Sequence, residues 1–223
     1  MTYTGEVSPG GTPDVRELGS LTITKVAVDE KMSNNCYLLT CKHDGSQVLI
    51  DAAAEPESLL PLIGAAGLTT VITTHQHWDH HRALAEVVEK TGAETVAGIP
   101  DADPITTQTG VPIARGVKQG DTIAVGDCTL EVITIAGHTP GSIALLYNDP
   151  DGHGHLFTGD SLFPGGVGNT FGDDAAFVQL IDDVETKIFQ RLPDDTWFYP
   201  GHGNDSTLGA ERPGLPEWRS RGW

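Results

Sequence analysis

The sequence is poor in basic residues. Its 223 residues include 13 lysines and arginines against 31 aspartates and glutamates, a formal net charge of −18. Because a surface of this sign repels phosphate groups, we expect neither nucleic acid nor an anionic membrane as a partner. No stretch approaches the roughly 18 apolar residues of a membrane-spanning helix, and the first twenty residues lack the basic and apolar regions of a secretion signal. We therefore expect a soluble cytoplasmic protein.

Cysteine is scarce as well. Cys36, Cys41 and Cys128 show no spacing typical of a metal site, so we expect reduced thiols that pack as small apolar groups in or near strands. A Gly-x-Ser-x-Gly motif is also absent, which argues against a serine nucleophile. Any metal must therefore be held by histidine and carboxylate side chains.

The length fits one domain, and we assign residues 1–20 to an N-terminal tail and residues 21–223 to a single domain. The pattern of apolar residues predicts helices at 56–66, 81–90 and 173–192. It predicts strands at 21–28, 35–41, 47–51, 69–74, 95–98, 142–147, 155–158 and 196–199, and two more within 122–136. Two β-rich halves, each closed by a helix, favour a sandwich of two sheets covered by helices.

The histidines, in contrast, are concentrated. Four of the nine lie in the stretch HQHWDHH at residues 75–81, directly after an apolar strand. Three other loops follow predicted strands and present His138, Asp160 and His202 beside glycine. Loops at one edge of a sandwich can converge on a single spot, which would then hold five histidines and two aspartates. Imidazole and carboxylate together favour zinc, iron or manganese.

Two metal ions fit this set better than one. The expected ligands are His75, His77 and His138 for the first ion and Asp79, His80 and His202 for the second, with Asp160 as a bridge. Two divalent cations, two carboxylates and one bridging hydroxide leave a charge of about +1, which favours a developing oxyanion. We therefore also count Asp79 and Asp160 as catalytic residues.

Each of these residues has a simpler interpretation when taken alone. Asp79 would serve as the cap of the helix that follows it, and a lone His138 or His202 after a glycine is ordinarily a loop histidine. What favours a metal centre is the spacing His-x-His-x-Asp-His together with Gly-His, Gly-Asp and Pro-Gly-His in this order.

The remaining histidines are given structural roles. We expect His81 to begin the helix at 81–90 and Trp78 to pack under the metal loop. His43, His153 and His155 lie in or beside turn sequences, so we expect them to be solvated.

These motifs resemble the metallo-β-lactamase-fold superfamily and, within it, the glyoxalase II-like hydrolases, over residues 21 to about 212. The stretches NCYL at 35–38 and LIDA at 49–52 belong to the resemblance. It implies an α/β fold, an αββα sandwich with the site at one sheet edge. It also implies the same division of the seven ligands between two metals, with zinc expected and iron or manganese as alternatives. Asp51 corresponds to a family aspartate behind the ligands, and a strand-end cap is an equal alternative.

The segment GDSLFPGGVGNT at residues 159–170 is similar to a stretch shared by glyoxalase II and persulfide dioxygenases, but Asn169 replaces its basic residue. In glyoxalase II the resemblance implies that this cation holds glutathione carboxylates. A neutral amide cannot pair with a carboxylate, so we expect Asn169 to bind a hydroxylated or amide-rich carrier. About twenty residues follow His202, too few for the helical domain of glyoxalase II. The tail at 207–213 and 216–223 resembles actinobacterial members thought to act on mycothiol esters.

Together these features predict a dinuclear metal hydrolase. Its substrate would be a thioester of a low-molecular-weight thiol, S-acyl or S-formyl mycothiol rather than glutathione, attacked by a metal-bridging hydroxide. Asp160 disfavours a lactam substrate. The alternatives are a persulfide dioxygenase with one non-haem Fe(II) on His75, His138 and Asp160, a lactonase, and a metal-stabilised binding module, for which four ligands suffice. The sequence leaves the acyl group, the native metal and the oligomeric state open.

Overall fold

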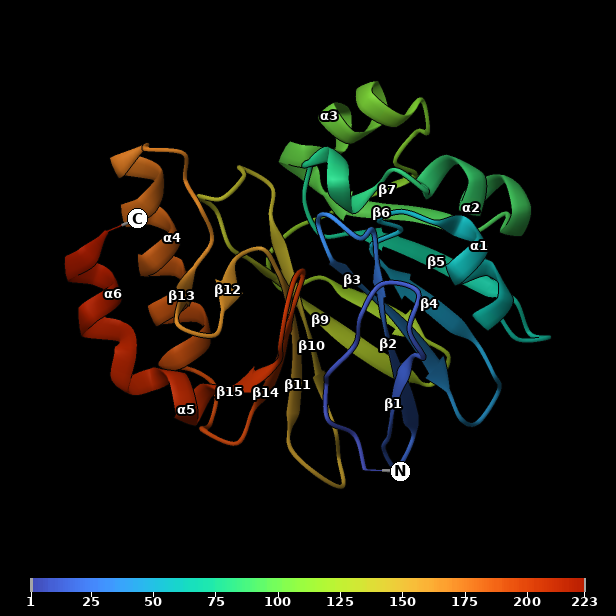
Figure 1. The fold of residues 1–223 in the computed structure, drawn as a ribbon, viewed down its shortest axis with the longest axis horizontal. Coiled ribbons are helices and arrows are strands. Elements are labelled where there is room, and N and C mark those ends of the chain that lie inside the picture. Colours follow the sequence, from blue (N-terminus) through green and yellow to red (C-terminus); the bar gives the residue numbers. More distant parts are fainter. Residues whose placement is uncertain (1, 223) are drawn as a thin grey trace.

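The computed structural model describes residues 2–222, and within them two β-sheets pack face to face with helices on both outer faces (Figure 1). The first sheet has the order β1-β2-β3-β4-β5-β6-β7. Its strands are β1 (Asp14–Glu17), β2 (Leu21–Val28), β3 (Asn34–Cys41), β4 (Gln47–Ile50), β5 (Leu68–Thr73), β6 (Glu94–Gly98) and β7 (Arg115–Val117).

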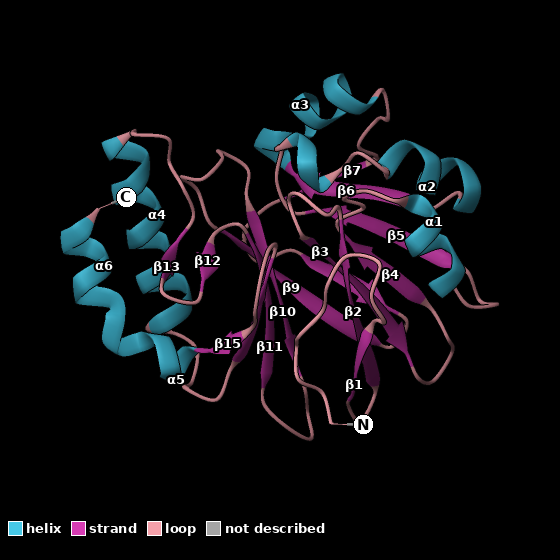
Figure 2. Cartoon of the chain, in the orientation of Figure 1, coloured by secondary structure: helices cyan, strands magenta, loops and turns pink. Residues whose placement is uncertain are grey.

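The second sheet has the order β15-β14-β11-β10-β9-β8. Its strands are β8 (Thr122–Val125), β9 (Cys128–Thr134), β10 (Ile143–Asn148), β11 (Gly154–Gly159), β14 (Trp197–Pro200) and β15 (Ser206–Thr207). A small hairpin of β12 (Leu162–Phe163) and β13 (Gly166–Val167) stands apart from both sheets (Figure 2).

The helices lie where the sheets contain parallel pairs. Neighbouring strands from β4 to β7 are parallel, as are β11 and β14, and parallel pairs need a crossover connection. The crossovers and the C-terminal segment form α1 (Pro56–Leu59), α2 (Leu84–Thr91), α3 (Ile99–Thr109), α4 (Asp174–Asp183), α5 (Leu208–Glu211) and α6 (Leu215–Arg221). Helices α1 to α3 cover the first sheet and α4 to α6 the second (Figure 1).

Three apolar layers hold the four layers of the fold together. Strand β3 directs Tyr37 and Leu39 into the core between the sheets, and it directs Cys36 and Leu38 towards α1 to α3. Strand β10 alternates in the same way between the sheet core and α4 to α6. This period of two on both sheets is what the sandwich needs, and it confirms the predicted αββα fold. The three cysteines are free and buried, as expected.

Several predicted boundaries were wrong. The helix expected at 56–66 is only α1 and a 3-10 turn, Leu60–Leu62, and that expected at 81–90 begins at Leu84. The segment treated as a tail contains β1, which pairs with β2. Helix α3 was not predicted from the sequence. It contains two prolines: Pro100 lies in the first turn, where its missing N–H costs nothing, and Pro104 lies inside the helix.

The C-terminal part of the chain was given no structure from the sequence. Helices α5 and α6 fill this part and pack Leu208 and Trp218 against the second sheet's helical layer; Trp223 lies outside the described residues. The long helix expected at 173–192 is confirmed as α4, capped by Asp173, and continues as a π-helical turn, Val184–Phe189. No helix in residues 2–222 has the length and apolar character to span a membrane.

Candidate metal centre

The seven predicted ligands follow the carboxyl ends of four strands. His75 to His80 follow β5, His138 lies in the loop from β9 to β10, Asp160 comes directly after β11 and His202 after β14. Strand β5 belongs to the first sheet and the other three to the second. The site therefore lies at the shared edge of the sandwich, and its halves come from different sheets.

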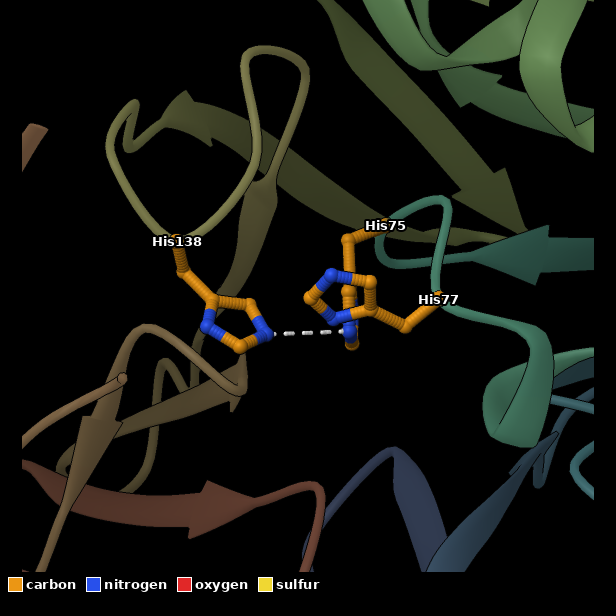
Figure 3. A group of neighbouring side chains, drawn as sticks. All are labelled: His75, His77 and His138. Atoms are coloured by element: carbon orange, nitrogen blue, oxygen red, sulfur yellow. Dashed lines mark hydrogen bonds between the residues drawn. The ribbon is translucent and has the colours of Figure 1, made fainter. Parts of the chain in front are cut away.

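The first group of donors is His75, His77 and His138. Their ring nitrogens all lie within 4.8 Å of one another, and the His75 and His138 Nε2 atoms are 3.3 Å apart (Figure 3). Ligand atoms about 2.0 Å from a tetrahedral zinc ion are about 3.3 Å from each other. The His75–His138 distance is therefore that of two ligands of one ion, and His77 lies close enough to be a third.

The second group of donors is Asp79, His80 and His202, again within 4.8 Å. The His80 and His202 Nε2 atoms are 3.2 Å apart, and Asp79 Oδ2 is 3.5 Å from the first and 3.4 Å from the second. These three atoms form a nearly equilateral triangle, an arrangement that could hold a second metal ion.

Asp160 lies between the two groups. Its carboxylate oxygens are 3.4 Å from His80 Nε2, 3.5 Å from His202 Nε2 and 3.7 Å from His138 Nε2. Its Oδ1 atom is buried yet accepts no hydrogen bond, a costly state that a cation would relieve. Gly201 permits this approach, because a Cβ there would lie 2.2 Å from Asp160 Oδ1.

Most of the imidazole rings are oriented through their Nδ1 atoms. The Nδ1 of His80 donates to Asp51 Oδ2, that of His138 to the Asn169 carbonyl and that of His202 to the Met32 carbonyl, at 2.7 to 2.9 Å. These bonds leave each Nε2 atom facing the cluster. Such partners fix the tautomer of metal-binding histidines.

Asp51 links the two groups from behind. It accepts from His80 directly, and from Thr74 Oγ1 at 2.8 Å, which in turn accepts from His75 Nδ1 at 3.0 Å. Asp51 also accepts the Thr74 backbone N–H at 2.8 Å. The two interpretations of Asp51 thus coexist: it closes the strand end and orients one ring of each group.

The ionisation of the cluster suits cations. Burial lowers the pKa of His75 and takes that of His138 to about 4, so both rings are neutral. Burial alone would raise the pKa of Asp160, but the charge of His80 and a hydrogen bond from His202 hold it well below its usual range. Burial would likewise lower the pKa of His202, yet Asp160 and Asp79 raise it to about 9. A metal bound at the second group would therefore have to displace protons.

The cluster opens into a cleft of about 610 Å³. Five of the seven candidate ligands line it together with apolar and amide side chains: Met32, His77, Trp78, Asp79, His138, Asp160, Phe163, Asn169, Phe171 and His202. None of these is a lysine or arginine. A larger cavity of about 790 Å³, lined by Cys41, Cys128 and Tyr147 among others, contains none of the seven candidate ligands.

Asn169 lies on the wall of the cleft, as its predicted role requires. Its side-chain oxygen accepts the backbone N–H of Phe171 at 2.6 Å, and its carbonyl accepts from His138. Part of the amide is therefore already engaged in shaping the loop, and the substrate-binding role stays a prediction.

Two supporting residues were missed from the sequence. Asn34 donates to Asp79 Oδ2 at 2.9 Å, and Asp101 accepts hydrogen bonds from two ligand loops. Both act on residues at least 25 positions away in the chain, so no local pattern marks them. His81 is buried and its Nε2 lies 3.2 Å from the Gln76 carbonyl; it precedes α2 and does not begin it.

Two structural expectations were wrong. Trp78 is 53% exposed at the mouth of the cleft, where the Arg82 guanidinium lies 4.8 Å from its ring centroid. His155 is fully buried, because β11 begins at Gly154 and turns this side chain inward. Burial lowers the pKa of His155 to about 3, and its Nδ1 is bonded to the Tyr199 hydroxyl at 2.8 Å.

The sequence profile of the Metallo-beta-lactamase superfamily matches residues 30–202, the stretch that carries all seven candidate ligands. The chain belongs to this superfamily. It is 34% identical over 168 residues to a Polaromonas protein named hydroxyacylglutathione hydrolase, covering 74% of this chain and 60% of that one. The chain thus spans about three fifths of that relative's length.

Solved structures of superfamily relatives superpose closely. ETHE1 from Myxococcus xanthus has a TM-score of 0.75 at 28% identity, covering 89% of this chain and 84% of its own. TTHA1623, solved in a di-iron-bound form, has a TM-score of 0.68 at 30% identity, covering 86% of this chain and 98% of its own. The solved structures support the fold, and the Polaromonas relative supports the resemblance to glyoxalase II-like proteins inferred from the motifs.

Proposed function

We propose that the protein is a dinuclear metal-dependent hydrolase that cleaves a thioester of a low-molecular-weight thiol. The observation that carries this proposal is the placement of Asp160 between two groups of three donors. The hydroxyacylglutathione hydrolase name of a relative and the di-iron form of another support it. Zinc is the expected metal, with iron or manganese as alternatives.

The donor set fits two such ions, since five imidazoles and two carboxylates match their ligand preferences. Two divalent cations, when bound, supply hydroxide at neutral pH and a field that stabilises an oxyanion. Asp79 and Asp160 would hold the ions and limit the net charge. Asn34 and Asp51 hold ligands in place from behind. The thiolate leaves without a protein acid, because it is a weak base.

We propose further that the carrier thiol is a neutral, hydroxylated one, with S-acyl or S-formyl mycothiol favoured over glutathione. The charged carboxylates of the cleft are Asp79 and Asp160, and no lysine or arginine lines it. The nearby Arg82 guanidinium is paired with Asp29 at 2.5 Å and packs on Trp78. A carrier with carboxylates would thus meet no free cation there, whereas Asn169 offers hydrogen bonds.

One other reaction has a structural argument. His75, His138 and Asp160 form a two-histidine, one-carboxylate set within the cluster, which suits a single non-haem Fe(II) and a persulfide dioxygenase. This alternative gives no role to Asp79, His80 and His202, although their donor atoms also lie within 4.8 Å of one another. We therefore rank it second.

The test combines metal analysis with a panel of substrates. We expect two metal ions per chain and hydrolysis of mycothiol esters in preference to the same acyl esters of glutathione. One iron per chain with oxygen uptake on a persulfide would instead establish the dioxygenase. Turnover of an acyl-homoserine lactone without thioester hydrolysis would establish a lactonase.

Asn169→Lys tests the carrier assignment. The new cation should raise kcat/KM for glutathione esters, because it can pair with a carboxylate. Asn169→Met is the matched control, since it also loses the bond to Phe171 but adds no charge. An unchanged carrier preference in the lysine variant, relative to the methionine variant, would remove Asn169 from the specificity argument.

A further inference from the structure

Asp101 is a fully buried carboxylate in the first turn of α3 that lies outside the seven candidate ligands. Its Oδ2 atom accepts the backbone N–H of Gln76 at 2.9 Å and the Thr139 hydroxyl at 2.6 Å. Its Oδ1 atom accepts the backbone N–H of Gly141 at 2.7 Å. All three of these bonds end on the loops of the candidate metal centre.

The three donors flank the first group of histidines. Gln76 separates His75 from His77, and Thr139 follows His138 directly. The first loop comes from β5 in one sheet and the second from β9 in the other. Asp101 therefore links, by hydrogen bonds, two loops that reach the same candidate metal site from different sheets.

The contact is close and specific. A Cβ at Gly141 would lie 2.5 Å from the Asp101 backbone nitrogen and 2.6 Å from its Oδ1, so the loop reaches the carboxylate only because residue 141 is glycine. An ionised carboxylate is an acceptor on both oxygens. No other side chain of this size accepts at both positions without offering a donor.

We propose that Asp101 is a positioning residue that sets the distance of His138 from His75 and His77, and so the affinity of the three-histidine site for its metal. The inference rests on the proposed dinuclear centre.

Asp101→Asn tests this link between the loops with almost no change in the shape of the side chain. An asparagine has one acceptor oxygen, and its NH₂ group must face either the Gly141 N–H or the Gln76 N–H. One loop is then repelled and its distance from the other grows. A hydrogen bond between backbone atoms, from Ile143 N to the Thr74 carbonyl at 3.0 Å, still joins the two loops where they leave their sheets. We therefore expect the variant to fold.

We expect the affinity of the three-histidine site to fall by about 10-fold to 100-fold, the usual effect of removing a partner behind a ligand. The affinity of the second group, Asp79, His80 and His202, should stay within about threefold. Asp101 makes no bond to these three residues, and its bond to the loop of Asp79 is at Gln76, three positions earlier. The measurement is calorimetric titration of the metal-free full-length protein with Zn²⁺ against a competing chelator. The absorption spectrum with Co²⁺ reports the coordination of the altered site.

Two further variants separate positioning from stability. Thr95→Val removes a buried hydroxyl that bonds the Pro112 carbonyl and the Ala114 N–H at 2.7 and 2.9 Å; it should lower Tm without changing either metal affinity. Thr139→Val should weaken the three-histidine site, and Thr139→Ser should restore it, because serine keeps the hydroxyl that reaches Asp101.

The outcomes are distinct. If Asp101→Asn binds two Zn²⁺ ions with wild-type affinities and an unchanged Co²⁺ spectrum, Asp101 has a purely structural role and the inference is overturned. A wild-type protein that binds no metal through its three histidines overturns it as well. A wild-type protein that binds two ions but hydrolyses no thioester overturns only the proposed function.

Discussion

Replacing Asp160 by asparagine tests whether one carboxylate serves two metal ions. Asp160 is the one candidate ligand with an oxygen within 3.7 Å of donors from both groups, His138 on one side and His80 and His202 on the other. Asparagine keeps the shape but has a single acceptor oxygen and no charge. The side chain can then reach one ion at most.

The size of the effect follows from the charge and the ligand count. Each ion loses or weakens one of its four protein ligands, and the net charge of the loaded centre rises from about +1 to about +2. If the paired ions contribute about 4 kcal/mol to transition-state stabilisation, kcat/KM falls by about 10³ when the pair is broken. The Asp160→Ala variant, which offers no oxygen, should show no turnover while the fold persists.

The assay is thioester hydrolysis at saturating Zn²⁺, with metal content measured on the same samples and circular dichroism as the check on folding. We expect about one tightly bound ion per chain in the asparagine variant. If that variant retains two ions and a kcat/KM within tenfold of the wild type, then Asp160 is no bridge, and the two-metal account of this cluster fails.

Three further predictions concern the surroundings of the cluster. Asp51→Asn should weaken metal binding at both groups by about 10-fold to 100-fold in a calorimetric titration, because Asp51 orients His80 directly and His75 through Thr74. If the variant binds metal with wild-type affinity, the role of Asp51 is limited to capping the end of the strand. Gly201→Ala should lower the metal content and the activity, since its Cβ would lie 2.2 Å from Asp160 Oδ1. A normal metal content would show that the loop moves to accommodate the Cβ. Removal of the metals by a chelator should lower Tm reversibly, by the equivalent of about 2.7 kcal/mol per site at a free metal concentration of 100 Kd; an unchanged Tm would mean that the ions do not bind the folded chain preferentially.

Much of the site could be predicted because its ligands are marked locally. Each one stands where an apolar strand gives way to a glycine or histidine loop, as Asp160 does after β11. The period of two in β3 and β10 likewise identifies the two-faced strands of a sandwich. A pattern that is complete within about ten residues needs no knowledge of the fold.

The residues that were missed depend on contacts across the chain. Asn34 reaches Asp79 from the start of β3, and Asp101 reaches Thr139 from α3. Neither sits in a sequence context that differs from an ordinary loop or helix start. His155 was misplaced for a related reason: whether a residue beside a turn is solvated depends on the residue at which the strand begins, here Gly154.

The way the ligands are held also bears on how such a cleft changes its substrate. His138 and His202 are oriented by the backbone carbonyls of Asn169 and Met32, and the side chains of these same two residues line the cleft. Because the backbone does the orienting, the side chains at both positions can be exchanged without removing a partner from either ligand. In the proposed function, different atoms of the same residues would therefore serve the metal chemistry and the choice of carrier thiol, which is why we expect Asn169→Lys to alter specificity and to leave the metals in place.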